Sequence, residues 1–401
     1  MTRAPTIDLR TPSGSAARPP SGGLAIAVAC YPGLGGSGVI ASELARGLAA
    51  KGHRVVVLAT AMPERLRVNG VRFEAIDVPT SPVFDHAPYG LAVANKLVEL
   101  VRRGDGIDLV HLHYAVPHAS SALLAATVLG AAAPAMIVTL HGTDVTQLGS
   151  HPSIHAVTAY ALATCDGLTS PSRFLRDEAA ERFDIAADRI AVISNFVDLA
   201  RFSPPPARDR SQLAALFPAG PDGPMLFHVS NFRPIKRTPE LADILAGVRT
   251  ALPAKMILVG DGPDHAAAIA RAGELGLTDH MRFLGRRDDF ESLLGHADGF
   301  VLPSDCESFG VAALEAMACG VPVFGYDVGG VPDVVGDTGA LVPRGDTAGL
   351  AHAITAGMPR SAELGRAARL RAESRFGSER VVAAYEDYFR RVLASRTKEG
   401  S

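Results

Sequence analysis

Short apolar segments alternate with amphipathic, helix-like segments along almost the whole of this 401-residue chain. Apolar strands of about four to eight residues followed by helical patterns are typical of βα units, whose parallel strands are buried on both faces. The first series of strand-like segments reads LAIAVAC (24–30), RVVVLAT (54–60), VRFEAI (71–76), IDLVHLH (107–113), AMIVTLH (135–141) and RIAVIS (189–194). The second series reads MLFHVS (225–230), KMILVG (255–260), MRFLG (281–285), GFVLPS (299–304) and VPVFG (321–325). The pattern predicts an α/β protein with two doubly wound parallel-sheet domains.

Composition places the boundaries of these domains. Proline-rich, polar segments near 204–206 and 218–224 interrupt the alternation and indicate a linker. The expected parts are an N-terminal Rossmann-like domain at 24–205, a linker at 206–223 and a second Rossmann-like domain at 224–376. Residues 1–23 lack an apolar segment of signal-peptide length and are expected to form a disordered tail. Residues 377–396 have apolar side chains at helical spacing, which predicts a terminal helix that packs back on the N-terminal domain.

The charge distribution excludes some classes of partner. Lys and Arg number 39 against 42 Asp and Glu, giving a formal net charge of −3, and no basic block stands out. Nucleic-acid binding normally requires a basic stripe, so this class is excluded. Residues 109–143 contain no Asp, Glu, Lys or Arg. Pro117 and Pro134 interrupt this segment, however, and a membrane span needs about 20 continuous apolar residues, so the segment is not predicted to span a membrane. The four cysteines form no CxxC pair, so we expect reduced thiols in a cytoplasmic protein without a membrane partner.

A glycine-rich turn follows the first strand-like segment. Gly33, Gly35 and Gly38 satisfy the pattern G-x-G-x-x-G at the start of a helix expected at 36–51. Glycines there let the backbone approach a phosphate, which the free N–H groups of a helix N-terminus attract. A dinucleotide site would also need an acid at the end of the next strand, and no acid occurs there before Glu64. The turn is therefore interpreted as an anion site, with nicotinamide binding or a ligand-free tight turn as alternatives.

Basic residues gather where a strand of the second domain ends. Arg233, Lys236 and Arg237 follow the segment MLFHVS and precede a helical pattern. Arginine forms forked contacts with phosphate oxygens and lysine supplies a point charge, so this junction suits a diphosphate. A solvated basic turn is the alternative interpretation.

The segment PSDCESFGVAALEAMACGVP (303–322) carries two carboxylates at a defined spacing. A helix is expected from near residues 308–309 to Gly320, which places Glu307 at its start and Glu315 two turns further on. Carboxylates accept hydrogen bonds from vicinal hydroxyls, and free N–H groups in a first helical turn donate to a phosphate. The segment can therefore bind a sugar, a phosphate and a ribose in succession. The alternatives are a helix-dipole partner for Glu307 and a solvated helix residue for Glu315.

The E-x7-E pattern of these two carboxylates, with GVPVFGYDVGGVPDVV (320–335) and VGDGP (259–263), resembles retaining family 4 glycosyltransferases of the GT-B fold. The resemblance covers residues 24–395 and implies two Rossmann-like domains that face a central cleft. Four shorter segments resemble the members that transfer N-acetylglucosamine from UDP-GlcNAc to L-malate at the start of bacillithiol synthesis. These segments are CYPGLGGSGVIASELA (30–45), VHLHYAVPHA (110–119), TLHGTDVTQLGS (139–150) and HVSNFRPIKR (228–237). The resemblance thus implies a cytoplasmic hexosyltransferase with these two small-molecule substrates, and it allows a homo-oligomer.

The same resemblance implies roles for individual residues. The implied donor-binding residues are Gly35, Gly36, Arg233, Lys236, Glu307, Phe309, Gly310 and Glu315. The implied catalytic residues are His141, Arg233, Lys236 and Glu307. The implied acceptor-binding residues are Ser37, Tyr114 and Thr139. Asn231 stands where family members often have an arginine, and Arg233 is assumed to replace that arginine at the phosphate.

Neither a metal ion nor a cofactor is expected. The sequence has no Asp-x-Asp motif, and fixed cationic side chains can stabilise a leaving diphosphate in its place. His111, His113 and His118 lie close together in sequence, but no carboxylate lies nearby to orient metal ligands, so structural or acceptor-lining histidines are favoured. Asp144 either orients His141 or caps the next helix.

Three other functions fit parts of this pattern. A sibling transferase would use another acceptor, such as inositol phosphate or a lipid-linked sugar, although a lipid-linked acceptor favours a basic amphipathic patch that the sequence does not show. A UDP-GlcNAc 2-epimerase would consume the donor without any acceptor. A nicotinamide-dependent oxidoreductase would bind NADH at the glycine-rich turn. Turnover that depends on the acceptor distinguishes the transferases from the other two classes.

Overall fold

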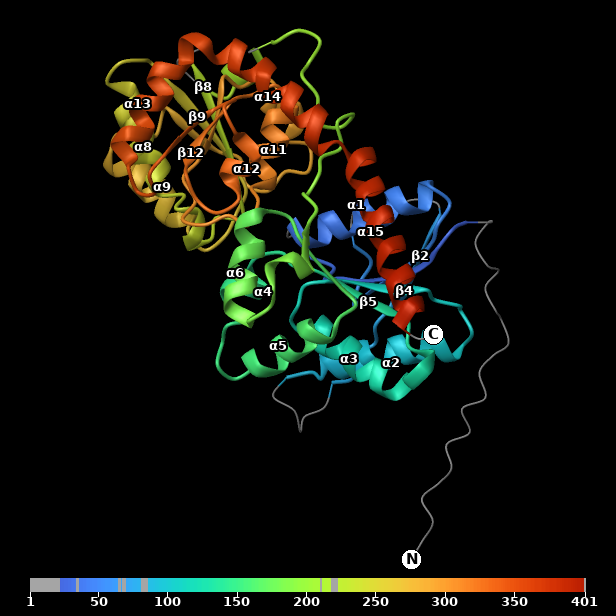
Figure 1. The fold of residues 1–401 in the computed structure, drawn as a ribbon. Coiled ribbons are helices and arrows are strands. Elements are labelled where there is room, and N and C mark those ends of the chain that lie inside the picture. The colour runs from blue at the N-terminus through green and yellow to red at the C-terminus, as the bar shows by residue number, and fades with distance from the viewer. Residues whose placement is uncertain are drawn as a thin grey trace, which may run out of the picture. The chain divides into compact units, whose positions relative to one another are not determined.

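The chain divides into two compact units, drawn in Figure 1 from a computed structural model of the protein. The structure describes residues 22–33, 36–63, 66, 70–80, 86–209, 211–217 and 223–399. The first unit comprises the described residues up to Thr169, those of Glu178–Ala191 and those from Ala384 onward. The second unit comprises Ser170–Asp177 and the described residues of Val192–Ala383. Each unit therefore combines segments that are far apart in sequence.

The first unit is built on a seven-stranded sheet with the order β3-β2-β1-β4-β5-β6-β7. Its strands are β1 (Ala25–Ala29), β2 (Arg54–Ala59), β3 (Val71–Ala75), β4 (Leu109–His113), β5 (Ala135–Thr139), β6 (Gly167–Ser170) and β7 (Ile190–Val192). Its helices are α1 (Gly36–Ala50), α2 (Tyr89–Arg102), α3 (His118–Leu129), α4 (Thr143–Thr146) and α5 (His155–Thr164), and α6 (Arg173–Phe183) belongs to it from Glu178 onward. Figure 1 shows α1 on one side of the strands and α2 and α3 on the other. Strands β1, β4 and β5 are consequently buried along their whole length, which explains their nearly continuous apolar sequences.

The second unit is built on a six-stranded sheet with the order β10-β9-β8-β11-β12-β13. Its strands are β8 (Met225–Val229), β9 (Lys255–Val259), β10 (Met281–Phe283), β11 (Gly299–Leu302), β12 (Val323–Tyr326) and β13 (Ala340–Val342). Its helices are α7 (Ser211–Ala214), α8 (Glu240–Arg249), α9 (His265–Glu274), α10 (Glu291–Leu294), α11 (Val311–Ala318), α12 (Val331–Val335), α13 (Thr347–Gly357) and α14 (Ser361–Phe376). Leu213 in α7 is fully buried in the core of this unit, together with Phe217, although both lie in the segment assigned to a linker from sequence.

Aspartates that precede central strands hold the start of each sheet together. Asp108 lies directly before β4, and its Oδ2 atom accepts the backbone N–H of Ala25 in β1 at 2.7 Å. Asp298 has the corresponding place before β11, where its Oδ2 atom accepts the N–H of Met225 in β8 at 2.8 Å. The two units thus use the same contact to join the strands at the centre of their sheets.

The strand order of each sheet reverses at one place, between β1 and β4 in the first unit and between β8 and β11 in the second. In open parallel sheets, ligands bind outside the carboxyl ends of the strands at such a topological switch point. The segments that follow these four strands are 30–36 and 114–118 in the first unit, and 230–237 and 303–310 in the second. They contain eight of the residues that the sequence singled out, namely Gly35, Gly36, Tyr114, Arg233, Lys236, Glu307, Phe309 and Gly310.

The last helix, α15 (Ser378–Glu399), starts in the second unit and belongs to the first unit from Ala384 onward. In the first unit its Tyr388 hydroxyl donates to the carbonyl of Leu168 at 2.9 Å, and its Tyr385 side chain is almost completely buried. This helix therefore forms part of the hydrophobic core of the first unit.

The predicted fold class is confirmed, because both sheets are doubly wound and every strand pairing with a described register is parallel. Two strands were not predicted, β6 and β13, because both are short and β6 reads GLTS, without an apolar run. The predicted tail at 1–23 lies outside the described residues except for its last two positions. Across the part of the chain that the structure describes, no helix has the length and apolar character that crossing a bilayer requires.

Candidate functional site

An ion pair spans the switch point of the second unit. Lys236 lies in the turn after β8, and Glu307 lies in the loop after β11, where the Lys236 Nζ and Glu307 Oε1 atoms are 2.6 Å apart. Ser304 Oγ donates to the same carboxylate oxygen at 2.8 Å. The structure therefore brings together two of the residues expected to bind the donor, a cation for a phosphate and a carboxylate for sugar hydroxyls.

The three cations after β8 have different surroundings. Arg237 has a positive φ of 50° and is held by Asp305, at 2.9 Å, and by Glu240. Arg233 is exposed, and its guanidinium forms no hydrogen bond or ion pair with the residues that the structure describes, although its backbone carbonyl accepts the N–H of Lys236 at 2.8 Å. Arg237 is therefore a structural cation, whereas Arg233 has its guanidinium available for an anion and Lys236 can exchange its carboxylate partner for a phosphate.

The loop that carries Glu307 is positioned by close backbone contacts. The N–H of Gly330 donates to the carbonyl of Glu307 at 2.8 Å. A side chain at Gly329, where φ is 55°, would place its Cβ 2.0 Å from that carbonyl oxygen. The two glycines of the segment GVPVFGYDVGGVPDVV are thus needed because the chain passes directly against the Glu307 loop.

Helix α11 begins at Val311, two to three residues later than the predicted start near 308–309. The difference arises at Gly310, which has a left-handed φ of 96° and ends the loop before the helix. Phe309 is buried, whereas Glu307 is half-buried at the surface of the loop. The amides of Phe309 and Gly310 precede a helix N-terminus, the position at which backbone N–H groups bind anions. Glu315 lies in the second turn of α11 and is 9% exposed, so the predicted spacing of the two carboxylates is present.

Aromatic and histidine side chains cluster after β1, β4 and β5 of the first unit. Tyr114 stacks on His141 with ring centroids 5.6 Å apart and an interplanar angle of 14°. His141 Nε2 lies 3.0 Å from His113 Nδ1, and His118 Nδ1 donates to the carbonyl of His113 at 2.6 Å. Tyr31 packs edge-on against Tyr114 at 5.6 Å. The structure thus places the predicted acceptor residue Tyr114 directly beside the predicted catalytic residue His141.

Burial keeps these histidines neutral. It lowers the pKa of His141 to about 3, with a smaller contribution from the charge of His118. Burial likewise lowers the pKa of His111 to about 3 and that of His118 to about 4. At neutral pH the cluster therefore offers hydrogen-bonding groups rather than positive charges.

Asp144 joins the two loops that carry Tyr114 and His141. It is fully buried, and its carboxylate accepts the backbone N–H groups of Ala115 at 2.9 Å, His141 at 3.0 Å and Gly142 at 2.7 Å. Burial raises the pKa of Asp144 although these N–H groups favour its charged form. Of the two roles considered from sequence, orientation of His141 is the one that the structure shows, because no side-chain cap is present at α4.

Two of the predicted acceptor residues differ in their access to solvent. Ser37 is half-buried in the first turn of α1. Thr139 is completely buried, and its hydroxyl is shared by His111 at 2.7 Å and Thr169 at 2.7 Å. The Thr139 hydroxyl is therefore bonded to side chains of the two neighbouring strands, and its contact with an acceptor stays a prediction.

The glycine-rich turn after β1 is only partly described. Gly35 lies outside the described residues, whereas Gly36 is exposed and is the first residue of α1. A Cβ on Gly38 would lie 2.6 Å from the carbonyl oxygen of Gly33 and 2.8 Å from that of Tyr31. The last glycine of the pattern is thus needed so that α1 can begin directly beside β1, at the switch point of the first sheet.

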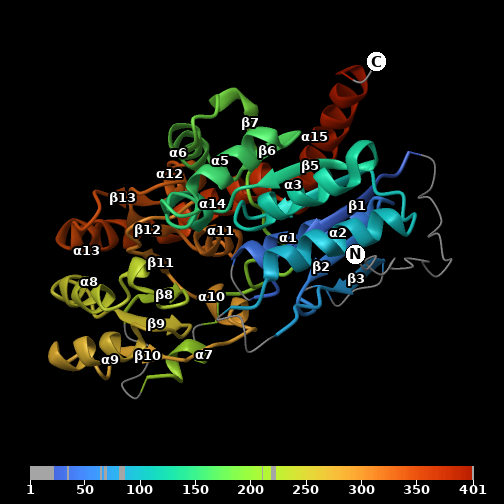
Figure 2. The same cartoon turned by 90° about the horizontal axis from the view of Figure 1, so that it is seen from below.

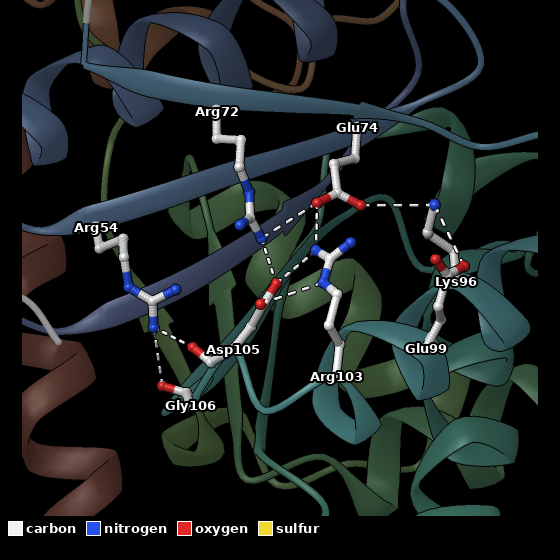
Figure 3. Close-up of polar contacts among 8 residues, drawn as sticks. All are labelled: Arg54, Arg72, Glu74, Lys96, Glu99, Arg103, Asp105 and Gly106. Carbon is white, nitrogen blue, oxygen red and sulfur yellow. Dashed lines mark hydrogen bonds and ion pairs between the residues drawn. The ribbon is translucent and has the colours of Figure 1, made fainter. Parts of the chain in front are cut away.

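A separate charged network lies at the opposite, amino end of the first sheet (Figure 3). The Arg103 Nη2 atom lies 2.6 Å from Asp105 Oδ2, and Arg103 also pairs with Glu74. The Lys96 Nζ atom lies 3.5 Å from Glu74 Oε2. Burial raises the pKa of Asp105, but hydrogen bonds from Arg103 and Arg72 outweigh it and hold that pKa below its ordinary value. Lys96 therefore pairs with carboxylates of this network, Glu74 and Glu99.

The described residues contain no cluster of three or more His, Cys, Asp or Glu side chains that could hold a metal ion. The histidines of the first-unit cluster instead form hydrogen bonds with one another, with the hydroxyls of Thr139 and Tyr89, and with the carbonyl of His113. The chemistry that these residues offer is therefore cationic contact with phosphates in the second unit and neutral hydrogen bonding in the first.

Known proteins resemble this chain over both units. The family model described as Glycosyltransferase Family 4 matches residues 34–201, and that described as Glycosyl transferases group 1 matches residues 223–358. N-acetyl-alpha-D-glucosaminyl L-malate synthase from Bacillus anthracis is 37% identical over 378 residues, which are 92% of this chain and 97% of the relative. The chain belongs to glycosyltransferase family 4. It is thus a glycosyltransferase, as the sequence predicted.

Solved structures confirm the GT-B fold of this family 4 glycosyltransferase. A glycosyltransferase from Rickettsia africae has a TM-score of 0.76 at 18% identity and covers 93% of this chain and 99% of its own. HepE from Anabaena, in complex with UDP and glucose, has a TM-score of 0.73 at 21% identity and covers 91% of this chain and 99% of its own.

The residues that position the site of this glycosyltransferase were not predicted from its sequence. The role of Asp144 was left open because a lone aspartate after a strand fits either a helix cap or a loop contact. The pair Gly329 and Gly330 was noted only as part of a family signature, although two adjacent glycines before a helix are themselves a sign of close backbone approach. Nothing in the local sequence showed that Arg237 would pair with Asp305, because that contact joins two distant loops.

Proposed function

We propose that this glycosyltransferase transfers N-acetylglucosamine from UDP-GlcNAc to the hydroxyl group of L-malate. The observation that carries the proposal is the end-to-end similarity to the Bacillus anthracis enzyme, whose name specifies this sugar and this acceptor. A match that covers 97% of the relative includes both sheets and both switch points, rather than the fold of one domain alone.

The second unit would bind the donor. Glu307 would accept hydrogen bonds from sugar hydroxyls, and the amides of Phe309 and Gly310 would donate to the same part of the donor. Glu315 would accept the ribose hydroxyls of uridine. These roles are supported by the half-buried position of Glu307 and by the place of Glu315 in the second turn of α11.

Arg233 and Lys236 would stabilise the diphosphate as it departs, together with the N-terminus of α1 at Gly36. Negative charge develops on the leaving oxygen, so a fixed cation there is worth about 3–4 kcal/mol of transition-state stabilisation. Arg233 is suited to this role because it is exposed and keeps its donors free of the described residues. Lys236 would move from Glu307 to a phosphate oxygen, which at the same time frees Glu307 for the sugar.

The acceptor proton is best assigned to the leaving group. A histidine with a pKa of about 3, such as His141, is a weak general base at neutral pH. In the proposed retaining step, the bond between the sugar C1 and the β-phosphate oxygen breaks, and the malate hydroxyl oxygen forms a new bond to C1 on the same face. The hydroxyl proton passes to a phosphate oxygen of UDP. His141 would then contact the donor sugar as a neutral hydrogen-bonding group, and Ser37 and Tyr114 would line the acceptor side.

The test is acceptor-dependent release of UDP. Purified protein is incubated with UDP-GlcNAc alone, with added L-malate, and with an inositol phosphate, in buffer containing a chelator. We expect UDP only when L-malate is present. Release with inositol phosphate but not with malate would overturn the acceptor, and loss of UDP-GlcNAc without any acceptor would indicate an epimerase or a hydrolase instead.

A further inference from the structure

The loop after β8 contains a backbone conformation that needs support. Phe232 has a φ of 40°, in the left-handed region that residues with a side chain rarely adopt, and its side chain is fully buried. Such a conformation persists only where the surrounding contacts fix it. Because Phe232 directly precedes Arg233, the contacts that fix Phe232 also set the place of Arg233.

Two side chains of the segment HVSNFRPIKR connect Phe232 to the neighbouring strand. The N–H of Phe232 donates to Ser230 Oγ at 3.3 Å, and Ser230 Oγ lies 2.8 Å from His228 Nε2. The Nδ1 atom of His228 lies 2.8 Å from the carbonyl oxygen of Val301 in β11. We refer to these two side chains as the His228–Ser230 pair. The pair therefore joins the loop after β8 to β11 by a continuous series of hydrogen bonds.

The direction of these hydrogen bonds follows from the chemistry of the groups. A carbonyl oxygen only accepts, so His228 Nδ1 carries a hydrogen and donates to Val301. Burial lowers the pKa of His228 to about 4, and the contact with Val301 offsets this only in part. A neutral imidazole with its hydrogen on Nδ1 accepts at Nε2, so the Ser230 hydroxyl donates to it. The Ser230 oxygen then accepts the N–H of Phe232, and every donor of the series has an acceptor.

The pair lies at the switch point of the second sheet. Figure 2 shows β8 between β9 and β11, the two strands that pair with it. The described register of β8 with β11 ends with Phe227 beside Phe300, and His228 and Val301 follow directly. The His228 side chain thus extends the contact between the two strands at their carboxyl ends, where ligands of open parallel sheets bind.

The segment VGDGP (259–263) and the residue after it hold the same loop from the side of β9. The N–H of Ser230 donates to the carbonyl of Val259 at 3.1 Å, and the N–H of Asp264 donates to the carbonyl of Phe232 at 2.9 Å. Asp264 therefore fixes the peptide group after Phe232, and the His228–Ser230 pair fixes the peptide group before it. Together the two contacts determine the unusual conformation of Phe232.

We propose that His228 and Ser230 are positioning residues for Arg233, and through Arg233 for the diphosphate of the donor. The proposal rests on the assignment of Arg233 to the diphosphate in the proposed function. The Arg233 side chain is exposed, and its guanidinium forms no hydrogen bond or ion pair with the part of the chain that the structure describes. The backbone at Phe232 is consequently what places its donors.

Lys236 is anchored separately. The carbonyl of Ile235 beside it accepts the N–H of Asp305 from the loop after β11 at 2.8 Å. The Lys236 Nζ atom also lies 2.6 Å from Glu307 Oε1 on that loop. Loss of the His228–Ser230 pair should therefore displace Arg233 and leave Lys236 in place.

The proposal is tested by a double-mutant cycle on UDP binding, measured by calorimetry with chelator-treated, full-length protein. Ser230→Ala removes the hydroxyl and should weaken UDP binding about 3- to 10-fold. In the Arg233→Ala background the same substitution should weaken binding less than about 2-fold, because the group that it positions is absent. A serine with a merely structural role would lower the thermal midpoint without this dependence on Arg233. The matched control is Ser361→Ala, which removes a buried hydroxyl bonded to the carbonyl of Asp298 in the same unit and should leave UDP binding unchanged.

His228→Phe tests the other member of the pair. Phenylalanine keeps an aromatic ring of similar size but leaves the Ser230 hydroxyl without its acceptor, so UDP binding should weaken in the same direction. The control is His296→Phe, which removes another buried histidine of the second unit, one that accepts the N–H of Asp209 at 3.0 Å, and should leave UDP binding unchanged. If the His228 variant does not fold, the cycle on the half-buried Ser230 decides the proposal.

Three results would overturn the proposal. The first is a Ser230→Ala protein that binds UDP as tightly as the unaltered chain while Arg233→Ala binds it more weakly, because Arg233 would then be placed without the hydroxyl. The second is an effect of Ser230→Ala that is equally large in both backgrounds, since the hydroxyl would then act on another group. The third is an Arg233→Ala protein that binds UDP normally, which would refute the assignment of Arg233 to the diphosphate itself.

Discussion

Replacing Asp144 by asparagine tests whether one buried carboxylate positions both loops of the first-unit site. The asparagine keeps one oxygen acceptor but turns an NH2 group toward at least one of the backbone N–H groups that the carboxylate now accepts, such as that of Ala115. Leaving one buried N–H unpaired costs about 1–3 kcal/mol of unfolding free energy. Asp144→Ala leaves three such groups without this acceptor and should cost roughly 3–5 kcal/mol.

The effect of Asp144→Asn on catalysis should exceed its effect on stability. The carboxylate fixes the backbone of His141, and a displacement of about 1 Å in a positioned group can reduce a rate roughly 100-fold. We therefore expect kcat with UDP-GlcNAc to fall about 10- to 100-fold in folded protein, while the KM for the donor changes little. Urea denaturation and steady-state kinetics measure the two quantities on the same samples.

Asp108→Ala is the matched control for this variant. Asp108 also accepts a backbone N–H, that of Ala25 at 2.7 Å, but it does so at the amino end of the sheet. This variant should lose a similar amount of unfolding free energy, about 1–3 kcal/mol, and keep the kcat of the unaltered protein. If both aspartate variants lose stability and both keep kcat, Asp144 is a structural residue and its assignment as a positioning residue is wrong.

Three further predictions concern other parts of the chain. Glu307→Gln should reduce kcat about 100-fold or more with an unchanged thermal midpoint, and near-normal turnover would refute the placement of the donor sugar. Arg233→Ala should weaken UDP binding about 10-fold or more in calorimetry without loss of stability, whereas Arg237→Ala should lower the urea midpoint, because only Arg237 is paired within the fold. The free energy of unfolding should fall in acid because of Glu386. Lys51 donates a hydrogen bond of 2.8 Å to the Glu386 carboxylate and lowers the pKa of Glu386 from 4.5 to about 2. The stability that the charged Glu386 contributes is therefore complete above pH 4.5 and is lost as the pH falls toward 2. Glu386→Gln should flatten this part of the stability curve, and an unchanged curve would contradict the assignment.

The architecture could be predicted because it follows from local patterns. Strands buried on both faces need nearly continuous apolar runs, and LAIAVAC and MLFHVS can hardly form anything else between helical segments. Strand β6 escaped prediction because its buried positions are filled by polar side chains, such as Thr169, that pair with the neighbouring strand. Short strands in the middle of a sheet depend on their neighbours for burial, which a local pattern does not show.

The site could be predicted only as a set of residues. The E-x7-E spacing located Glu307 and Glu315, and the structure confirms that α11 carries the second of them. Partners were not predictable, because the contacts of Glu307 with Lys236 and of Arg237 with Asp305 join loops about 70 residues apart. The surroundings of Thr139 were not predictable for the same reason: its position at the end of β5 suggested access, and nothing local showed that side chains from β4 and β6 form hydrogen bonds with its hydroxyl.

The central claim is that cationic side chains and backbone amides of this protein bind the diphosphate of the donor. Titration of UDP into chelator-treated protein in a calorimeter tests it most directly. We predict heat of binding without added metal, and loss of that heat in the double variant Arg233→Ala, Lys236→Ala. Binding that appears only after a divalent cation is added, or that persists unchanged in the double variant, would contradict the claim.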